Sequence, residues 1–333
     1  MKARPIYQMY EIPMYGKNRS NYEMEVLTMK FKKILAPLLA CALLMASCTA
    51  PEEESVSSSP AADTGSTLSL PEPMPEESAP VASEVPLTSS EMEQNLEAQA
   101  NVSSLPALDN QKLGWGQGTN KNGKNQPVGC LDYQEKYGKY DAHFIESDEK
   151  IIYLTFDEGY ENGYTSQILD VLKEKEAKAV FFITYDYAKR NPELVQRMID
   201  EGHAVGNHTW SHPSMPEVSL EQAQDEVLKL HEYVRDHFQY EMTLFRFPKG
   251  EFSEQTLALL QSLNYQSVFW SYAYADWDPD KQMEPAAALK KLTDNCHDGA
   301  IYLLHAVSKT NAEVLGQAID GLRSKGYTLE LFR

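Results

Sequence analysis

The stretch Ile151-Ile-Tyr-Leu-Thr-Phe156 is a short, β-rich apolar run, and two carboxylates, Asp157 and Glu158, follow it directly. Apolar runs of this length are typical of strands that are buried on both faces. An amphipathic segment over residues 164–175 comes next, and a second apolar run spans residues 179–184. The order strand, helix, strand predicts parallel strands joined by a helix.

The same alternation continues to the end of the chain. Further helices are predicted at 191–201, 219–238, 253–263, 286–295 and 311–325, and further strands at 203–207, 244–247, 266–271, 300–304 and 327–331. Asn191-Pro192 is typical of a helix start, and Ser219 with Gln222 has the capping-box pattern. Strands that are apolar on both faces indicate a parallel sheet covered by helices. The residues are too few for eight strand–helix units, so we expect an incomplete α/β barrel.

Charge is unevenly distributed along the chain. The 333 residues carry 30 Lys and Arg against 49 Asp and Glu, a formal net charge of −19. Residues 49–108 hold eleven acidic side chains, no basic one and eight of the 18 prolines. Such a segment cannot bury enough apolar surface to offset the entropy of folding, so residues 48–108 are predicted to be a disordered acidic linker rich in Pro, Ser and Glu. The negative charge disfavours a nucleic-acid partner bound through its phosphates.

An export signal precedes the linker. Met29-Lys-Phe-Lys-Lys33 is positively charged, and residues 34–45 form an apolar run of the length of a signal-peptide core, too short to span a bilayer comfortably. The run ends in Leu44-Met-Ala-Ser-Cys48, which resembles the bacterial lipobox, so residues 29–47 are the predicted signal peptide and Cys48 the predicted lipidation site. The expected location is therefore outside the cytoplasm, on the bacterial cell membrane as a lipoprotein. A plain cleaved signal peptide, which would give a secreted protein, is the alternative.

Residues 1–28 fit neither scheme, and we interpret them as a spurious or non-structural extension with translation starting at Met29. Residues 109–333 form the one predicted folded domain, which we expect to be a monomer. Export would permit a disulfide. Cys130 and Cys296 could pair or stay free, and the sequence leaves both possibilities open.

Reactive side chains follow the predicted strands. In barrels of parallel strands, function gathers at the carboxyl ends of the strands. Those positions hold Asp157 with Glu158, His208 with His212, Arg246, Asp276 and His305. Each feature alone has a plain structural explanation, such as a surface histidine pair, a salt-bridging arginine or a turn aspartate. Their occurrence at five successive strand ends predicts one catalytic site.

His208 and His212 stand four residues apart, a spacing at which both imidazoles reach one metal ion if the segment makes a helical turn. Pro213 disfavours the helical conformation at His212, so the turn is expected to end there. Together with Glu158, the pair would form a two-histidine, one-carboxylate metal set with open positions for water and substrate.

Five stretches in order resemble the motifs of the polysaccharide deacetylase family with NodB homology. They are Thr155-Phe-Asp-Glu-Gly159, His208-Thr-Trp-Ser-His212, Arg246-Phe-Pro-Lys-Gly250, Ala275-Asp-Trp277 and Leu303-Leu-His305. Within the family, the chain is most similar to the delta-lactam-biosynthetic de-N-acetylases of the spore cortex. That similarity is carried by Trp115-Gly-Gln-Gly-Thr-Asn120, Phe156-Asp-Glu-Gly-Tyr-Glu-Asn-Gly-Tyr164, Val268-Phe-Trp-Ser271 and Gly299-Ala-Ile-Tyr-Leu-Leu-His305. The resemblance covers about residues 145–330 and implies an incomplete or distorted (β/α)7 barrel.

The resemblance implies hydrolysis of an acetamide on a glycan. Asp157 would be the general base, kept ionised by Arg246. His305 would protonate the departing amine, with Asp276 orienting its ring. Contacts with the substrate are implied for Tyr160, Pro248, Gly250 and Trp277.

A divalent metal, zinc or alternatively cobalt, is implied on His208, His212 and Glu158, where it would polarise the acetyl carbonyl. The chain departs from the family at Glu158, because most members have Asp there and the cortex branch commonly has Asn. The additional methylene of Glu changes the reach of the carboxylate toward a metal.

The subfamily resemblance implies peptide-free N-acetylmuramic acid in peptidoglycan strands as substrate, on the way to the muramic delta-lactam of the spore cortex. Deacetylases of N-acetylglucosamine in peptidoglycan or chitin, and esterases of O-acetyl xylan, share the chemistry and are alternatives. An alternative of a different class is a non-catalytic, surface-anchored glycan-binding lipoprotein. The departure from the family at Glu158 leaves this alternative open.

Overall fold

The computed structural model describes residues 105–146 and 149–333. The predictions for residues 1–28 and 29–47, for lipidation at Cys48 and for most of the linker lie outside the described residues. The 3-10 helix η1 (Leu105–Ala107) already packs on the folded part, because Leu105 is buried in the main core and its carbonyl accepts a hydrogen bond from Gln255 at 3.0 Å. Within these two ranges, no helix combines the length and the apolar character needed to cross a membrane.

In the described part of the chain, nine strands form one parallel sheet. Their spatial order is β2 (Ala142–His143), β8 (Gln266–Val268), β6 (Leu244–Phe245), β5 (Ala204–Asn207), β4 (Ala179–Ile183), β3 (Ile151–Glu158), β10 (Ala300–His305) and β9 (Tyr272–Ala273), with β11 (Thr328–Leu329) paired to β3. Every pairing within it is parallel. A separate antiparallel pair joins β1 (Leu113–Gly114) to β7 (Glu251–Phe252). The predicted parallel α/β architecture is confirmed.

Residues 266–273 contribute a strand near each of the two edges of the sheet, so the sheet is curled. β8 pairs with β6, β9 pairs with β10, and only residues 269–271 separate β8 from β9. The Phe269 N–H donates to the carbonyl of His143 at 2.8 Å, whereas the Ser271 N–H donates to the carbonyl of Ile301 on β10 at 2.9 Å. The sequence predicts one strand over 266–271; β8 instead ends at Val268, where the chain changes its hydrogen-bonding partner, and β9, which begins at Tyr272, is not predicted. The result is the expected incomplete barrel.

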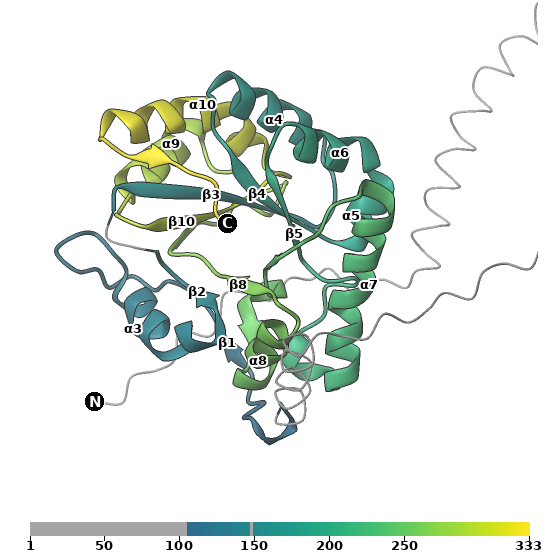
Figure 1. Cartoon of the computed structure of the whole chain (residues 1–333). Helices are drawn as coiled ribbons and strands as arrows, with labels where there is room; N and C mark the ends of the chain where they lie inside the picture. The colour runs from purple at the N-terminus through teal and green to yellow at the C-terminus, as the bar shows by residue number, and fades with distance from the viewer. Residues whose placement is uncertain (1–104, 147–148) are drawn as a thin grey trace, which may run out of the picture. The chain divides into compact units, whose positions relative to one another are not determined.

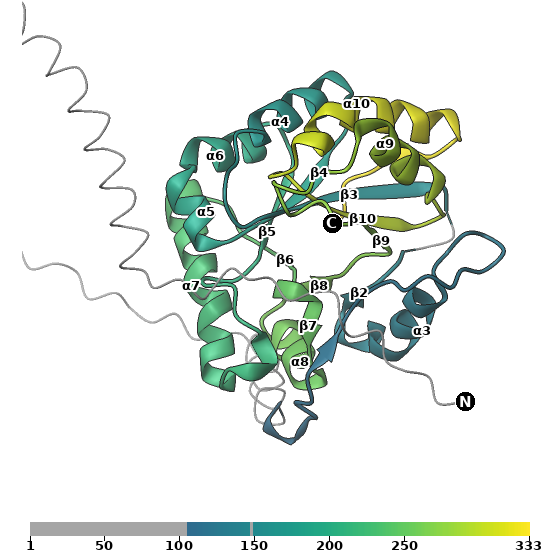
Figure 2. The same cartoon turned by 180° about the vertical axis from the view of Figure 1, so that it is seen from behind.

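Helices surround the outside of the strands (Figures 1 and 2). They are α3 (Val128–Tyr137), α4 (Thr165–Glu174), α5 (Tyr185–Arg190), α6 (Pro192–Asp200), α7 (Leu220–Phe238), α8 (Glu254–Ser262), α9 (Pro285–Asp294) and α10 (Lys309–Ser324), with 3-10 turns η2 (Gly138–Tyr140), η3 (Met215–Glu217) and η4 (Pro248–Gly250). The capping box of Ser219 and Gln222 is present, and Pro192 is the first residue of α6, as predicted. Helix α5 is not anticipated by the sequence; Thr184 caps it by accepting a hydrogen bond from the Tyr187 N–H at 3.3 Å. Cys130 and Cys296 are buried free thiols.

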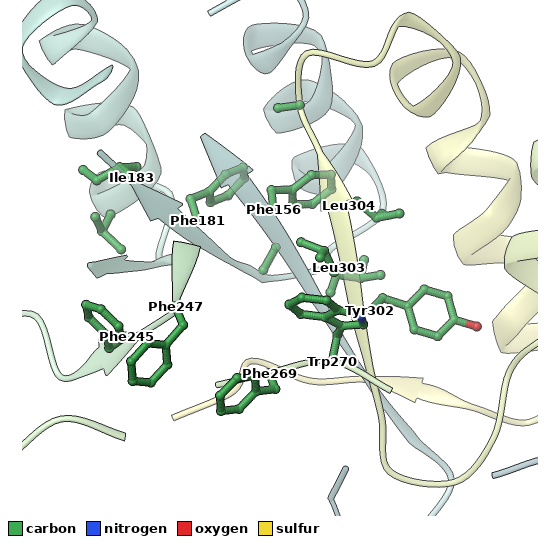
Figure 3. Packing of buried hydrophobic residues seen from close by; sticks show 14 of the residues in the cluster. Phe156, Phe181, Ile183, Phe245, Phe247, Phe269, Trp270, Tyr302, Leu303 and Leu304 are labelled. Carbon is green, nitrogen blue, oxygen red and sulfur yellow. The ribbon is translucent and has the colours of Figure 1, made fainter. Parts of the chain in front are cut away.

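The two faces of the curled sheet carry different apolar clusters. The larger cluster includes helix residues, and in it Phe156 and Phe181 stack with ring centroids 5.2 Å apart (Figure 3). The smaller one consists of strand residues such as Phe182 and Ile301 with the C-terminal Leu331 and Phe332, so it fills the inside of the sheet. Because successive strand residues point to opposite faces, Phe181 and Phe182 belong to different clusters. The same alternation separates the two carboxylates at the end of β3.

Candidate active site

Arg246, just after β6, is a completely buried cation that points at Asp157 from inside the sheet. Its Nη1 donates to Asp157 Oδ1 at 3.0 Å and to Thr155 Oγ1 at 2.7 Å. Nε and Nη2 donate to the carbonyls of Val268 and Phe269 at 2.9 and 3.1 Å. These four hydrogen bonds satisfy most of the guanidinium and fix its direction. The arrangement gives Asp157 a rigid cationic partner.

Asp157 is 8% exposed, so its charge depends on its neighbours. Burial acts to raise the pKa of Asp157, but the positive charges of Arg246, His208 and His305 outweigh it and lower that pKa below its ordinary value. The carboxylate therefore stays ionised over a wide pH range. An ionised, partly accessible carboxylate is suited to accept a proton from water.

His305 ends β10 directly opposite Asp157 in the strand register. Its Nδ1–H donates to Asp276 Oδ1 at 2.7 Å, and its backbone N–H donates to Asp276 Oδ2 at 2.9 Å. Asn311 Nδ2 donates to the same Oδ2 at 2.6 Å, and the Tyr274 hydroxyl donates to Asn311. Asp276 is thus locked in place and selects the tautomer of His305. The other ring nitrogen, Nε2, is left to exchange a proton with a substrate.

Burial acts to lower the pKa of His305, but the carboxylates of Asp276 and Asp157 outweigh it and raise that pKa above its ordinary value. The side chain of His305 remains 23% exposed. A protonated histidine therefore faces an ionised carboxylate across neighbouring strands. That pair can act as acid and base in one reaction.

His208 and His212 lie together, with ring centroids 4.9 Å apart. The carbonyl of Arg246 is 2.8 Å from His208 Nδ1, so Nδ1 carries the hydrogen and Nε2, 3.6 Å from Asp157 Oδ2, is the unprotonated nitrogen. Burial lowers the pKa of both histidines, that of His212 to about 3. Both rings are therefore neutral, which is the form that binds metal ions.

The segment between the two histidines does not make the helical turn that was the condition for both to reach one metal ion. Thr209 and His212 have φ values of 72° and 60°, in the left-handed region. The Thr209 N–H donates to Asn207 Oδ1 and the His212 N–H to Thr209 Oγ1, both at 2.9 Å. These side-chain oxygens accept hydrogen bonds from backbone N–H groups that would otherwise bond within a helical turn, so they favour a non-helical loop. The expectation that Pro213 keeps His212 out of the right-handed helical conformation is confirmed.

Glu158 does not join the histidines. It pairs with Ile183 in the strand register, on the outer face of the sheet, and its side chain is completely buried there. Its Oε1 lies 3.4 Å from the Thr165 hydroxyl oxygen, and its Oε2 has no hydrogen-bond partner. Over residues 105–146 and 149–333, no three His, Cys, Asp or Glu side chains are placed to hold a metal ion. The predicted metal set of Glu158, His208 and His212 is therefore corrected: the structure assembles the two histidines only.

The predicted substrate contacts fall into two groups. The Trp277 ring lies 6.3 Å from that of His305, so Trp277 borders the site, and Tyr160 is 36% exposed in the loop after β3. Pro248 and Gly250 are buried in η4. Gly250 has a φ of 66°, and a Cβ there would lie 2.8 Å from Trp270, so packing alone requires glycine.

Sequence reasoning missed Thr155 and Asn311. Thr155 lies two residues before Asp157, and strand alternation places it on the same face, beneath the carboxylate. Asn311 opens the last predicted helix, where a polar residue is interpreted as part of a helix start. The sequence pattern carries no signal that Asn311 turns back to hold Asp276.

Comparison with known proteins supports the chemistry that the site geometry suggests. Residues 145–268 match the sequence profile of the family described as polysaccharide deacetylase. The chain is 41% identical over 226 residues to the peptidoglycan-N-acetylmuramic acid deacetylase PdaA of Bacillus subtilis (strain 168), which covers 67% of this chain and 86% of that protein. The structure of Bacillus subtilis PdaA, a family 4 carbohydrate esterase, superposes with a TM-score of 0.64 at 40% identity, covering 67% of this chain and 96% of that one.

A family 4 carbohydrate esterase from Bacillus anthracis superposes with a TM-score of 0.56, also at 40% identity, covering 67% of this chain and 95% of that one. The family profile, over residues 145–268, spans the strand ends that carry Asp157, His208 and Arg246. Fold, site geometry and sequence identity thus agree, and the chain belongs to the polysaccharide deacetylase family.

Proposed function

We propose that this protein removes the acetyl group from N-acetylmuramic acid in peptide-free peptidoglycan strands, on the way to the muramic delta-lactam of the spore cortex. The observation that carries the chemistry is the register pair of an ionised Asp157 and a protonated His305. Support for muramic acid comes from the 41% identical relative, whose name specifies that sugar.

The reaction is a hydrolysis in two steps. Asp157 takes a proton from water while the water oxygen attacks the acetyl carbonyl carbon, which leaves a tetrahedral oxyanion. His305 then gives its Nε2 proton to the amide nitrogen, the C–N bond breaks, and acetic acid and the free amine result. The proton that Asp157 took up afterwards passes to His305, which restores an ionised Asp157 and a protonated His305. Arg246 and Asp276 touch no reacting atom; they set the charge and direction of the base and the acid.

Deacetylases of this family generally use a metal ion. His208 and His212 are the residues here that would contribute to holding zinc or cobalt, and such an ion supplies polarisation of the acetyl carbonyl. Because Glu158 lies on the opposite face of β3, the predicted three-ligand set does not fit. The steps above therefore use the protein groups alone.

The pH dependence of kcat/KM follows from the two shifted groups. Activity requires Asp157 ionised and His305 protonated. The pKa of Asp157 is below its ordinary 3.8 and that of His305 above its ordinary 6.5, so we expect a broad plateau. Activity falls as the pH drops below the pKa of Asp157 or rises above the pKa of His305. In Asp276→Asn the basic limb should move to lower pH while the acidic limb stays; a basic limb unchanged in that variant would exclude His305 as the acid.

The substrate is tested by offering two glycans to the whole protein. Peptide-stripped peptidoglycan and chitin oligomers are incubated with the protein in parallel, and mass spectrometry of the products measures the loss of acetyl groups. We expect loss from muramic acid residues and little from chitin. Preferred loss from the glucosamine residues of either glycan would assign the protein to that alternative instead.

We also propose that the mature protein is extracytoplasmic and anchored through a lipid on Cys48. The lipobox-like segment before Cys48 and the acidic linker after it support this location. Replacing Cys48 with serine should move the protein from the membrane fraction to the medium. Retention of that variant in the membrane would contradict the lipid anchor. The monomeric state remains a prediction.

A further inference from the structure

Glu158 is buried on the outer face of the sheet with an unusual set of neighbours. The Thr165 hydroxyl, at the start of α4, approaches Glu158 Oε1 at 3.4 Å and also donates to Glu161. The Tyr187 hydroxyl of α5 lies 3.5 Å from the same Glu161 carboxylate. Glu158 Oε2 is buried and has no partner. These contacts all belong to the helix side of β3, and none involves a histidine.

The loop after β3 is attached to the helices through this cluster. Glu161 Oε1 accepts from the Gly163 N–H at 2.5 Å and from the Thr165 N–H at 3.4 Å. At the other end of the loop, the carbonyl of Gly159 accepts from Thr184 Oγ1 at 3.3 Å. Tyr160, a predicted substrate contact, lies in the sequence between these two attachments. The cluster therefore supports the loop from behind.

The buried, carboxylate-rich surroundings of Glu158 favour its protonated form. Burial raises the pKa of Glu158 well above its ordinary value, and the charges of Glu161 and Asp157 act in the same direction. A neutral carboxylic acid carries no charge with which to attract a cation. Its position and its chemistry both differ from those of a metal ligand.

We propose that Glu158 is a positioning residue that supports the loop of residues 159–164 through Thr165 and Glu161, and that a divalent cation at this site is bound by His208 and His212 without it. Glu158 thus replaces the family's usual aspartate in sequence but not in role. The glutamine variant is the sharpest probe, because Gln has the same shape as a neutral Glu and keeps a polar group beside the Thr165 hydroxyl.

The ligand half of the proposal is tested by titrating the whole protein with cobalt and following visible absorption, which requires no substrate. Glu158→Gln should bind cobalt as wild type does, within about twofold, whereas His212→Gln should weaken binding about 10–100-fold. Wild-type protein that binds no cobalt would contradict binding by the two histidines and would overturn this half of the proposal. A loss of about tenfold or more in Glu158→Gln, with a changed spectrum, would overturn the proposal.

The positioning half rests on the proposed function and is measured as KM and kcat on peptide-stripped peptidoglycan. Because the loop carries Tyr160, Glu158→Ala and Thr165→Val should each raise KM about fivefold or more with kcat nearly unchanged, and Glu158→Gln should restore KM. If Glu158→Ala fails to fold, Thr165→Val and Glu158→Gln decide the question. A KM unchanged in Thr165→Val, or a kcat reduced about 100-fold in Glu158→Gln, would refute the positioning role. Inactivity of wild type would instead count against the proposed function and leave the cobalt result standing.

Discussion

Asp157→Asn is expected to lower kcat by roughly 10²–10⁴-fold, the usual contribution of a general base. Asparagine keeps the shape of the side chain and can still accept from Arg246 Nη1, which lies 3.0 Å from Oδ1. It cannot take a proton from water. The loss should therefore appear in kcat, measured as acetate release from peptide-stripped peptidoglycan, with KM little changed.

The matched control is Asp278→Asn, which changes an aspartate whose contacts are with its own exposed loop. That variant should keep wild-type activity. Circular dichroism of Asp157→Asn should match wild type, because Asp157 is a partner of Arg246 and not part of an apolar cluster. Turnover of Asp157→Asn within about tenfold of wild type would remove Asp157 from the role of base.

Arg246→Met is expected to reduce the free energy of unfolding by about 3–5 kcal/mol, the cost of leaving one member of a buried ion pair without its partner. Arg246 is completely buried and Asp157 nearly so. Methionine removes the bonds to Asp157, Thr155 and two backbone carbonyls at once. The pKa of Asp157 should rise in this variant, because the charge that lowers it most is absent. Urea unfolding near neutral pH measures the change.

The double variant Asp157→Asn with Arg246→Met separates the charge effect from the packing effect. Removing both charges should recover part of the lost stability, since no unpaired buried carboxylate remains. Equal losses in the single Arg246→Met variant and the double variant would show that the unpaired carboxylate of Asp157 does not account for the loss. A single-variant loss below about 1 kcal/mol would contradict the buried pair itself.

The order of elements was predictable because it depends on local patterns. The apolar run at β3, the proline at the start of α6 and the capping box of α7 each determine their element through nearby residues. The end of β8 at Val268 and the presence of β9 were not, because they depend on the partners β6 and β10, which lie away from them in the sequence. Helix α5 was missed because its six residues are too few to show a clear period.

The location of the candidate site residues was predictable because they follow strands, and parallel strands end at one edge of the sheet. The direction of each side chain depends on register, and this is where the sequence interpretation failed. Glu158 was predicted to join the two histidines, yet alternation places Asp157 beside Arg246 and Glu158 beside Thr165. The histidine loop likewise depends on Asn207 and Thr209, whose role is visible only in three dimensions.

Hydrolysis in water labelled with heavy oxygen tests the central claim most directly, because the claim is that water activated by Asp157 attacks the acetyl carbon. The whole protein is incubated with peptide-stripped peptidoglycan in labelled water, and the released acetate is weighed by mass spectrometry. The account predicts acetate that carries one labelled oxygen, with a free amine left on the glycan, and almost no acetate from Asp157→Asn. Glycan binding without acetate release would contradict it and would identify a binding protein instead.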